Sequence, residues 1–297
     1  MADRDLWTAV SDAISTASGE KFVPTGTDQV GGGCINEACV LHGSAASYFI
    51  KLNSASQLDM FEAEAAGLNE IIRSQSVRAP VPLTYGTAAG RAWLVMEFLE
   101  LGGRARDSME SLGRQLAAMH RTTQSQFGWW RDNTIGSTPQ INTRCEEWAA
   151  FWINERLRFQ FDLAAGRGHG GRLQQRGELL MDACAALLTE HGPQASLLHG
   201  DLWSGNYSIC RDGMPAIFDP AVYYGDRETD IAMTELFGGF SGDFYRAYDE
   251  AWPLNAGYRI RRMLYNLYHI LNHLNLFGAG YRGQAEQMID TLLAELR

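Results

Sequence analysis

Four features that would define other classes of protein are missing from this chain of 297 residues. No stretch approaches the roughly 20 apolar residues that a membrane-spanning helix needs, so we expect no membrane partner. There is no basic run, and the net charge of −10 argues against a nucleic-acid partner, whose phosphates a protein must neutralise. The five cysteines form no CxxC pair, which argues against a disulfide framework and a zinc site. The N-terminal sequence MADRDLWTAVSDAIS lacks the basic end and apolar run of a secretory signal, so we expect a cytoplasmic protein.

The pattern of the chain changes after its first third. Apolar residues at helical spacing predict an opening helix over residues 5–17, and a second helix is expected over 58–73. The expected strands are residues 21–30, 37–42, 48–52 and 92–99. From residue 106 onward the periodicity is mostly helical. This change predicts an α+β protein with two unequal lobes, residues 1–99 and 100–297.

The strongest chemical pattern is HGDLWSGN at residues 199–206, followed by IFDP at 217–220. Phosphoryl transfer needs a carboxylate that orients the attacking hydroxyl and accepts its proton, and oxygen ligands for Mg²⁺. Protein kinases supply these groups as HRDLxxxN and a later DFG. Asp201 stands five residues before Asn206, as in that loop, and Asp219 follows further on. We therefore predict an ATP-dependent kinase with Asp201 as base, and Asn206 and Asp219 as Mg²⁺ ligands.

The segment between the two metal ligands, residues 207–218, predicts two strands around a DG turn. Such a hairpin would fold Asp219 back beside Asn206. The pattern departs from protein kinases because Gly200 replaces the Arg, DPA replaces DFG, and no APE follows. We therefore expect no activation loop, and a substrate that is small or a small adduct.

Lys51 stands on a short strand after a glycine-rich turn, where this fold places the cation that grips the α- and β-phosphates. A glutamate of the following helix should hold it, and both Glu62 and Glu64 are candidates. The apolar stripe of that helix is formed by Phe61, Ala65, Leu68 and Ile72. At about 100° per residue, Glu64 lies about 60° from the centre of the stripe and Glu62 about 100° away. Helical geometry therefore favours Glu64.

Ahead of Lys51, the glycines Gly31, Gly32 and Gly33 can let backbone N–H groups approach phosphates, although three glycines also make an ordinary flexible turn. We predict that they contact the nucleotide. Trp203 lies inside the catalytic pattern, and its flat indole is a candidate to pack against a sugar face.

Two further patterns have plainer interpretations. His269 and His273 are four residues apart, but the neighbouring leucines favour a packing helix over a metal site. The adjacent Trp129 and Trp130 are either core residues or part of a sugar site.

Several stretches closely resemble the fructosamine-3-kinase family, and the resemblance covers nearly the full length. They include GGCINE at 32–37, FEAE at 61–64, HGDLWSGN at 199–206, DPA at 219–221, YGDRETDIAM at 224–233, LFGGF at 236–240 and LYNLY at 264–268. The motifs after the catalytic loop are more specific than the HGD core, which aminoglycoside and choline kinases share. The resemblance implies a protein-kinase-like bilobal fold, in which residues 1–99 bind the nucleotide phosphates and 100–297 carry the catalytic loop and substrate site.

This resemblance also implies a reaction. The family phosphorylates the 3-hydroxyl of a ketosamine, the sugar adduct that glycation leaves on an amine, and the unstable 3-phosphate is then lost, which restores the amine. The expected partner is a small ketosamine or a glycated protein lysine, with the sugar preference and the oligomeric state left open. Some members carry a cysteine at the position of Cys34 and are linked to redox-dependent association, so Cys34 is either a redox site or an incidental small residue.

The resemblance assigns further roles by position. Glu97, Phe98 and Leu99 become the hinge that meets adenine through its backbone. Asp230 resembles an inward Asp that braces the catalytic loop. Asp226 stands where many relatives have His, which leaves its role open.

Two other functions compete with this interpretation. The first is a kinase for an aminoglycoside, choline or another amine-bearing alcohol. The second is a catalytically silent nucleotide-binding regulator, which predicts that one of four residues is missing. These four, Lys51, Asp201, Asn206 and Asp219, are all present.

Overall fold

A computed structural model describes residues 2–31 and 35–296, so the predictions for Gly32, Gly33 and Cys34 lie outside the described residues. It contains two compact units. Unit 1 comprises Met1–Ser108 and Ser208–Asp219, and unit 2 comprises Met109–Tyr207 and Pro220–Arg297. The functional division at residue 99 stays a prediction. Within the described ranges, every helix is too short or too polar to cross a membrane.

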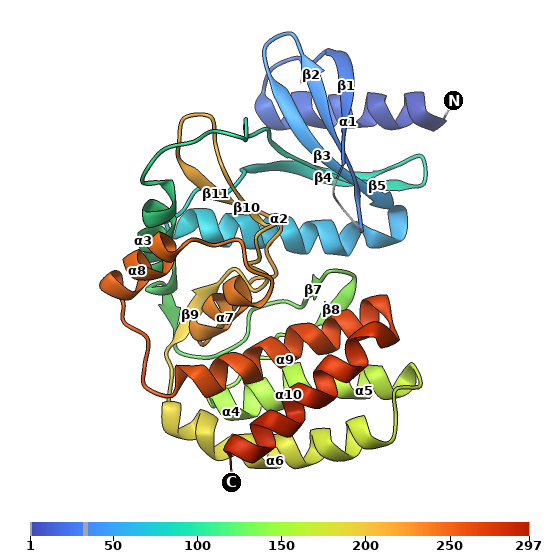
Figure 1. The fold of residues 1–297 in the computed structure, drawn as a ribbon. Coiled ribbons are helices and arrows are strands. Elements are labelled where there is room, and N and C mark those ends of the chain that lie inside the picture. The colour runs from blue at the N-terminus through green and yellow to red at the C-terminus, as the bar shows by residue number, and fades with distance from the viewer. Residues whose placement is uncertain (1, 32–34, 297) are drawn as a thin grey trace. The chain divides into compact units, whose positions relative to one another are not determined.

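Unit 1 is built around an antiparallel sheet with the strand order β1-β2-β3-β5-β4. Its strands are β1 (Pro24–Val30), β2 (Glu37–Gly43), β3 (Ser47–Ser54), β4 (Pro82–Ala88) and β5 (Arg91–Glu97). Its helices are α1 (Ala2–Ser18), the 3₁₀ turn η1 (Ala55–Gln57) and α2 (Leu58–Arg73). The helices α1 and α2 and four of the strands match the predicted positions, whereas η1 and β4 were not predicted. Figure 1 shows α1 and α2 on opposite faces of the sheet.

The two faces of β3 differ because side chains alternate along a strand. Ile50 and Leu52 face α1, where they are buried with a stripe of that helix. The stripe is Leu6, Val10 and Ile14, at the spacing expected of one helical face. Lys51 lies between them in the chain and therefore points to the opposite face, which α2 covers.

A hairpin of β10 (Tyr207–Ile209) and β11 (Pro215–Ile217) confirms the prediction for residues 207–218. Its backbone is bonded to the segment after β5: the N–H groups of Gly102 and Gly103 donate to the carbonyl of Ile209 at 2.9 and 3.0 Å. A Cβ on Gly103 would lie 1.9 Å from the carbonyl oxygen of Cys210, so this close approach requires glycine. Residues 208–219 are therefore an integral part of unit 1.

Unit 2 is mostly helical. Its helices are α3 (Ser108–His120, whose first residue belongs to unit 1), α4 (Trp148–Phe151), the π-helical η2 (Trp152–Arg158), α5 (Phe159–Gly166), α6 (Arg172–His191), α7 (Glu228–Leu236), α8 (Gly242–Ala251), α9 (Tyr258–Phe277), η3 (Ala279–Tyr281) and α10 (Arg282–Glu295). Its strands form two small sheets, β12 (Tyr223–Gly225), β9 (Ala195–Leu198) and β6 (Thr123–Gln124) in one, and β7 (Asn133–Ile135) and β8 (Thr138–Gln140) in the other.

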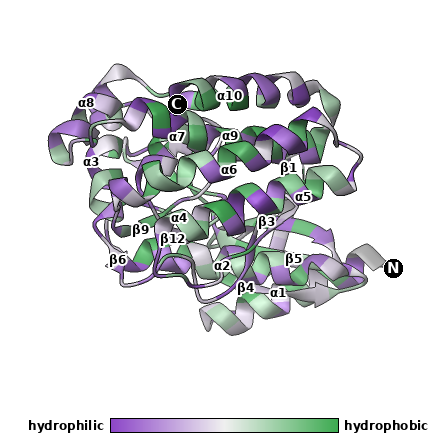
Figure 2. Ribbon diagram, turned by 90° about the horizontal axis from the view of Figure 1, so that it is seen from below, coloured by the Kyte–Doolittle hydropathy of each residue, from purple (hydrophilic) through white to green (hydrophobic). Residues whose placement is uncertain are grey.

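The central helix of unit 2 is α9, which packs against α5, α7 and α10. In Figure 2 its ribbon carries both hydrophobic and hydrophilic residues. Leu264, Leu267, Leu271 and Leu274 are fully buried, and His269 is buried among them. The packing-helix interpretation of this segment is therefore confirmed.

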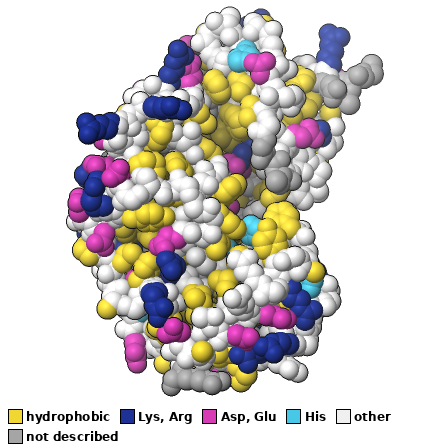
Figure 3. All heavy atoms as spheres, in the orientation of Figure 1, with side chains coloured by type: hydrophobic (Ala, Val, Ile, Leu, Met, Phe, Trp, Pro, Cys, Tyr) yellow, Lys and Arg dark blue, Asp and Glu magenta, His cyan; other side chains and the backbone are white. Residues whose placement is uncertain are grey.

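On the surface, charges of both signs lie close together. Figure 3 shows Lys and Arg beside Asp and Glu at several places on the visible face. Arg246, for example, donates to Glu110 at 2.6 Å and to Asp243 at 3.0 Å, with its side chain half exposed. Exposed pairs of this kind contribute about 0–1 kcal/mol each, so they do little for stability.

Candidate active site

The buried lysine of β3 is held by two carboxylates. The Lys51 Nζ donates to Glu64 Oε1 at 2.6 Å and to Asp219 Oδ1 at 2.5 Å. Burial by itself would lower the pKa of Lys51, but the charges and hydrogen bonds of Asp219 and Glu64 outweigh burial and raise the pKa above its usual value. The lysine is therefore a permanent cation. The pairing with Glu64, predicted from helical geometry, is confirmed.

The two acids differ in burial. Burial raises the pKa of Glu64, while the charge of Lys51 acts to lower it. Asp219 is more open, because 47% of its side chain is exposed. Its φ of +59° lies in the left-handed region, which is uncommon for residues other than glycine and is tolerated best by Asn and Asp. The end of β11 thus holds an accessible carboxylate in an unusual backbone conformation beside a fixed cation.

The predicted hinge begins at the last residue of β5. The Glu97 carboxylate accepts from Arg78 at 3.2 Å and from the Val81 N–H at 3.3 Å. Leu99 is buried with Cys210 and Ala216 of the hairpin. The Glu97 and Leu99 side chains are thus both engaged within unit 1, and the hinge role of this segment stays a prediction. Arg78, which also binds Asp212 in the hairpin turn at 3.0 Å, was not identified from the sequence.

In unit 2, the catalytic pattern forms a loop between β9 and β10. The Asn206 side chain donates from Nδ2 to the Asp201 carbonyl at 2.8 Å and to its Oδ2 at 3.4 Å. The Asp201 N–H donates to His199 Nδ1 at 3.2 Å. The structure therefore brings Asp201 and Asn206 together, with the Asn206 amide oxygen left as the atom that can bind a cation.

Asp230 of α7 anchors the start of this loop through hydrogen bonds. Its carboxylate accepts from the backbone N–H groups of His199 at 2.7 Å and Gly200 at 2.8 Å, and from His120 Nε2 at 3.1 Å. Burial would raise the pKa of Asp230, but the His120 hydrogen bond and the nearby charges lower it below its usual value. Asp230 is therefore ionised where the loop needs an acceptor, as the resemblance implied. His120 was not identified from the sequence.

Gly200 stands where protein kinases have Arg, and the local geometry explains the change. Its φ is +83°, and a Cβ there would lie 2.1 Å from the carbonyl oxygen of Ala221. The Ala221 N–H in turn donates to the His199 carbonyl at 2.8 Å. Any side chain at position 200 would separate these two segments.

Two predicted ligand contacts lie on exposed residues. Trp203 is 39% exposed, and its indole packs over Gly205, where a Cβ would lie 2.3 Å from the ring. Gly31 is exposed, and a Cβ there would meet open space. Neither residue is required by the core, so both are accessible to a ligand.

The open question of Asp226 has a structural answer. The buried Asp226 carboxylate accepts from His191 Nε2 at 2.9 Å and from the Tyr265 hydroxyl at 2.5 Å. His191, Asp226 and Glu228 are close enough to hold a cation. However, Arg261 already donates to both oxygens of Glu228 at 2.7 and 2.9 Å, which neutralises it. We interpret the cluster as a buried polar network that ties α6, α7 and α9 together.

Known structures with the same fold define the class of protein. A choline kinase from Streptococcus pneumoniae has the same fold, with a TM-score of 0.62 at 14% sequence identity over 98% of this chain and 99% of the other. The predicted α+β, protein-kinase-like fold is therefore confirmed. A crystal structure from Haemophilus somnus, described as that of a candidate fructosamine-3-kinase, matches with a TM-score of 0.89 and 28% identity over 97% of both chains.

Sequence comparison identifies the family. The fructosamine kinase profile matches residues 6–295, and the chain belongs to this family. It is 46% identical to a probable ketoamine kinase of Synechocystis sp. over 97% of both chains. It is also 43% identical to the chloroplastic protein-ribulosamine 3-kinase of Oryza sativa subsp. indica, over 92% of this chain and 80% of that protein.

Proposed function

We propose that this chain is an ATP-dependent ketosamine 3-kinase that takes part in deglycation. The observation that carries the proposal is the buried Lys51, which two carboxylates hold as a permanent cation at the position where kinases bind nucleotide phosphates. Family membership and the similarity to ketoamine and ribulosamine kinases support the acceptor class. The competing acceptors, aminoglycosides and choline, have support from fold alone.

Each of the two proposed magnesium ligands offers an oxygen atom. Asp219 offers a half-exposed carboxylate and Asn206 an amide oxygen, and Mg²⁺ prefers oxygen ligands of this kind. When bound with the nucleotide, Mg²⁺ neutralises charge on the phosphates. Lys51 contributes a second, fixed positive charge toward the α- and β-phosphates, and Glu64 keeps it in place.

The remaining roles follow the kinase pattern. Asp201 orients the 3-hydroxyl of the ketosamine and accepts its proton as the phosphoryl group is transferred. Asn206 restrains Asp201 through the 2.8 Å bond to its carbonyl. Trp203 packs its exposed indole against the sugar.

The nucleotide is held at both ends in this scheme. Gly31, with Gly32 and Gly33, contacts the phosphates through the backbone, and Glu97, Phe98 and Leu99 meet adenine. The cytoplasmic location and the absence of nucleic-acid partners stay predictions, and so does the redox role of Cys34.

A substrate panel tests the proposal. The purified chain is incubated with ATP and Mg²⁺ and with a ribulosamine, a fructosamine, an aminoglycoside or choline, and the products are analysed by mass spectrometry. We expect one added phosphate on the ketosamines, placed on the 3-oxygen by NMR, and slow release of phosphate with recovery of the free amine. Phosphorylation of only the aminoglycoside or choline would refute the ketosamine assignment.

A further inference from the structure

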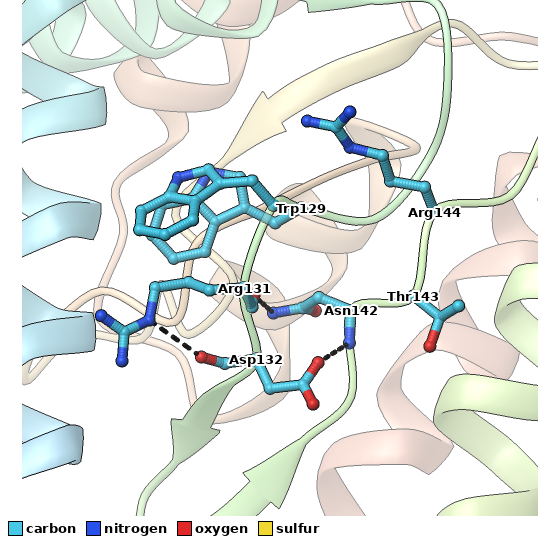
Figure 4. A pocket seen from close by; sticks show the side chains of 7 residues that line it. Trp129, Arg131, Asp132, Asn142, Thr143 and Arg144 are labelled. Carbon is cyan, nitrogen blue, oxygen red and sulfur yellow. Dashed lines mark hydrogen bonds between the residues drawn. The ribbon is translucent and has the colours of Figure 1, made fainter.

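A cavity of about 530 Å³ lies within unit 2, on segments to which the scheme above gives no role. Figure 4 shows it lined by the chain after Phe127 and by the segment that follows β8. Trp129 and Trp130 form a tilted pair, with ring centroids 5.4 Å apart. The sequence left open whether this pair belongs to the core or to a binding site. The two residues differ in burial: Trp129 is a core residue that is 3% exposed, whereas Trp130 is 59% exposed.

The walls of the cavity are bonded to each other. The Trp129 N–H donates to the Asn142 carbonyl at 2.9 Å, and the Asn142 N–H donates to the Asp132 carboxylate at 2.8 Å. The Asn142 side chain donates to the Arg131 carbonyl at 3.1 Å, as the dashed lines in Figure 4 show. The cavity is thus preformed, which lowers the entropy that a ligand loses on binding.

The lining offers more donors than acceptors. Within residues 2–31 and 35–296, the buried Trp129 Nε1 has no hydrogen-bond partner, and a buried N–H left unpaired is unfavourable. Arg144 is exposed and forms no ion pair with any residue of the same ranges. The Asp132 carboxylate already accepts from Asn142. A ligand that accepts hydrogen bonds and carries negative charge fits this lining, and the open indole of Trp130 suits an aliphatic chain next to that charge.

The segments around the cavity are also hydrogen-bonded to residues 221–224, which lie beside the catalytic loop in unit 2. Gly128, next to Trp129, exchanges backbone hydrogen bonds with Tyr224, each 2.9 Å long. The Gln140 side chain donates to the Ala221 carbonyl at 3.0 Å. Gly200, the residue before Asp201, packs against this same Ala221 carbonyl. The cavity is therefore fixed to the segment that supports the proposed base.

We propose that this cavity is a subsite for a carboxylate on the amine portion of the ketosamine, with Arg144 and the indole Nε1–H of Trp129 as its donors. This inference rests on the proposed function and narrows the substrate class. In a lysine adduct the sugar and the carboxylate lie at opposite ends of a flexible aliphatic chain. In this proposal the exposed indole of Trp130 packs against that chain. The carboxylate has two possible sources, a free glycated amino acid or an acidic residue beside a glycated lysine in a polypeptide.

Matched substrates test the subsite. Initial rates are measured with the Nε-ribulosyl adducts of Nα-acetyl-lysine and of its amide, which differ only in the carboxylate. Arg144→Ala should raise KM for the carboxylate adduct roughly fivefold, about 1 kcal/mol, and leave KM for the amide and both kcat values unchanged. Trp129→Phe keeps an aromatic side chain, although a smaller one, and removes the indole N–H donor, so it should raise the same KM about two- to threefold. The control is Arg259→Ala, an exposed arginine that pairs with Glu295 of α10 and should change neither KM.

The outcomes separate the two proposals. Equal KM changes for both adducts in Arg144→Ala, or no change in either, would overturn the subsite while leaving the kinase proposal intact. No phosphorylation of either adduct by the unmodified chain would overturn the proposed function, and this inference with it. Glycated peptides with Glu or Gln beside the modified lysine distinguish the source: a Glu preference that Arg144→Ala abolishes assigns the subsite to polypeptides, and its absence assigns it to free amino acids.

Discussion

The substitution Asp230→Asn tests whether α7 holds the catalytic loop through charge. One Asp230 oxygen accepts from the Gly200 N–H at 2.8 Å, and the other accepts from the His199 N–H at 2.7 Å and from His120 at 3.1 Å. Asparagine has nearly the same shape but only one acceptor oxygen. If that oxygen keeps the bonds to His199 and His120, the new NH₂ group faces the Gly200 N–H, and two donors oppose each other.

The cost follows from these contacts. Leaving the buried Gly200 N–H unpaired costs about 1–3 kcal/mol, and the two surviving bonds lose roughly 1 kcal/mol each because they are no longer charge-assisted. We therefore expect the free energy of unfolding to fall by about 3–5 kcal/mol. Domains are typically stable by about 5–15 kcal/mol, so the variant should still fold. Because the Gly200 peptide adjoins Asp201, we also expect kcat to fall at least about tenfold.

Guanidinium unfolding followed by fluorescence measures the stability, and initial rates with a ribulosamine measure kcat. Asp162→Asn removes the same charge from an exposed position on α5 and should change the unfolding free energy by less than about 0.5 kcal/mol. Asp230→Ala leaves every donor unpaired and should destabilise more than Asp230→Asn. If Asp230→Asn matched Asp162→Asn in both stability and kcat, the bracing role would be refuted.

Three other changes have defined outcomes. Gly200→Ala forces a Cβ to within 2.1 Å of the Ala221 carbonyl at φ +83°, so it should lose about 2–4 kcal/mol in guanidinium unfolding, and a smaller loss than 1 kcal/mol would contradict the contact. Burial and the nearby His273 lower the pKa of His269 to about 3, so the unfolded chain binds the extra proton below its ordinary pKa of 6.5. Stability should then fall by about 2 kcal/mol from pH 7 to pH 5, and His269→Gln should remove this part of the slope. Burial raises the pKa of Cys184 to about 12, so iodoacetamide should modify it far more slowly in the native chain than in urea, and site-resolved mass spectrometry showing equal rates would contradict this.

Local sequence patterns were sufficient for the parts of the site that depend on one helix or one turn. The angle between Glu64 and the apolar stripe of α2 identified the partner of Lys51, because a helix fixes the direction of every side chain. The DG turn between two short apolar runs identified the β10–β11 hairpin, because such a turn joins two neighbouring antiparallel strands. Both signals lie within a few residues.

Contacts between distant segments could not be predicted in this way. His120 and Asp230 are 110 residues apart, and Arg78 and Asp212 are 134 apart, so neither spacing carries a local signal. The strand β4 was missed because its sequence PLTYGTA contains Pro and Gly, which are depleted in strands. The resemblance to a known family implied the bracing role of Asp230, whereas its contact with His120 was found only in the structure.

The most direct test of the central claim replaces the proposed base. Asp201→Asn keeps the loop's shape, because the Asn206 bond to the residue 201 carbonyl does not depend on the carboxylate. With a ribulosamine and ATP, we predict that turnover falls by about 10²–10⁴, as expected when a general base is removed, while calorimetric titration gives an ATP affinity within about threefold of the unmodified chain. Turnover at the unmodified rate in Asp201→Asn would contradict the account.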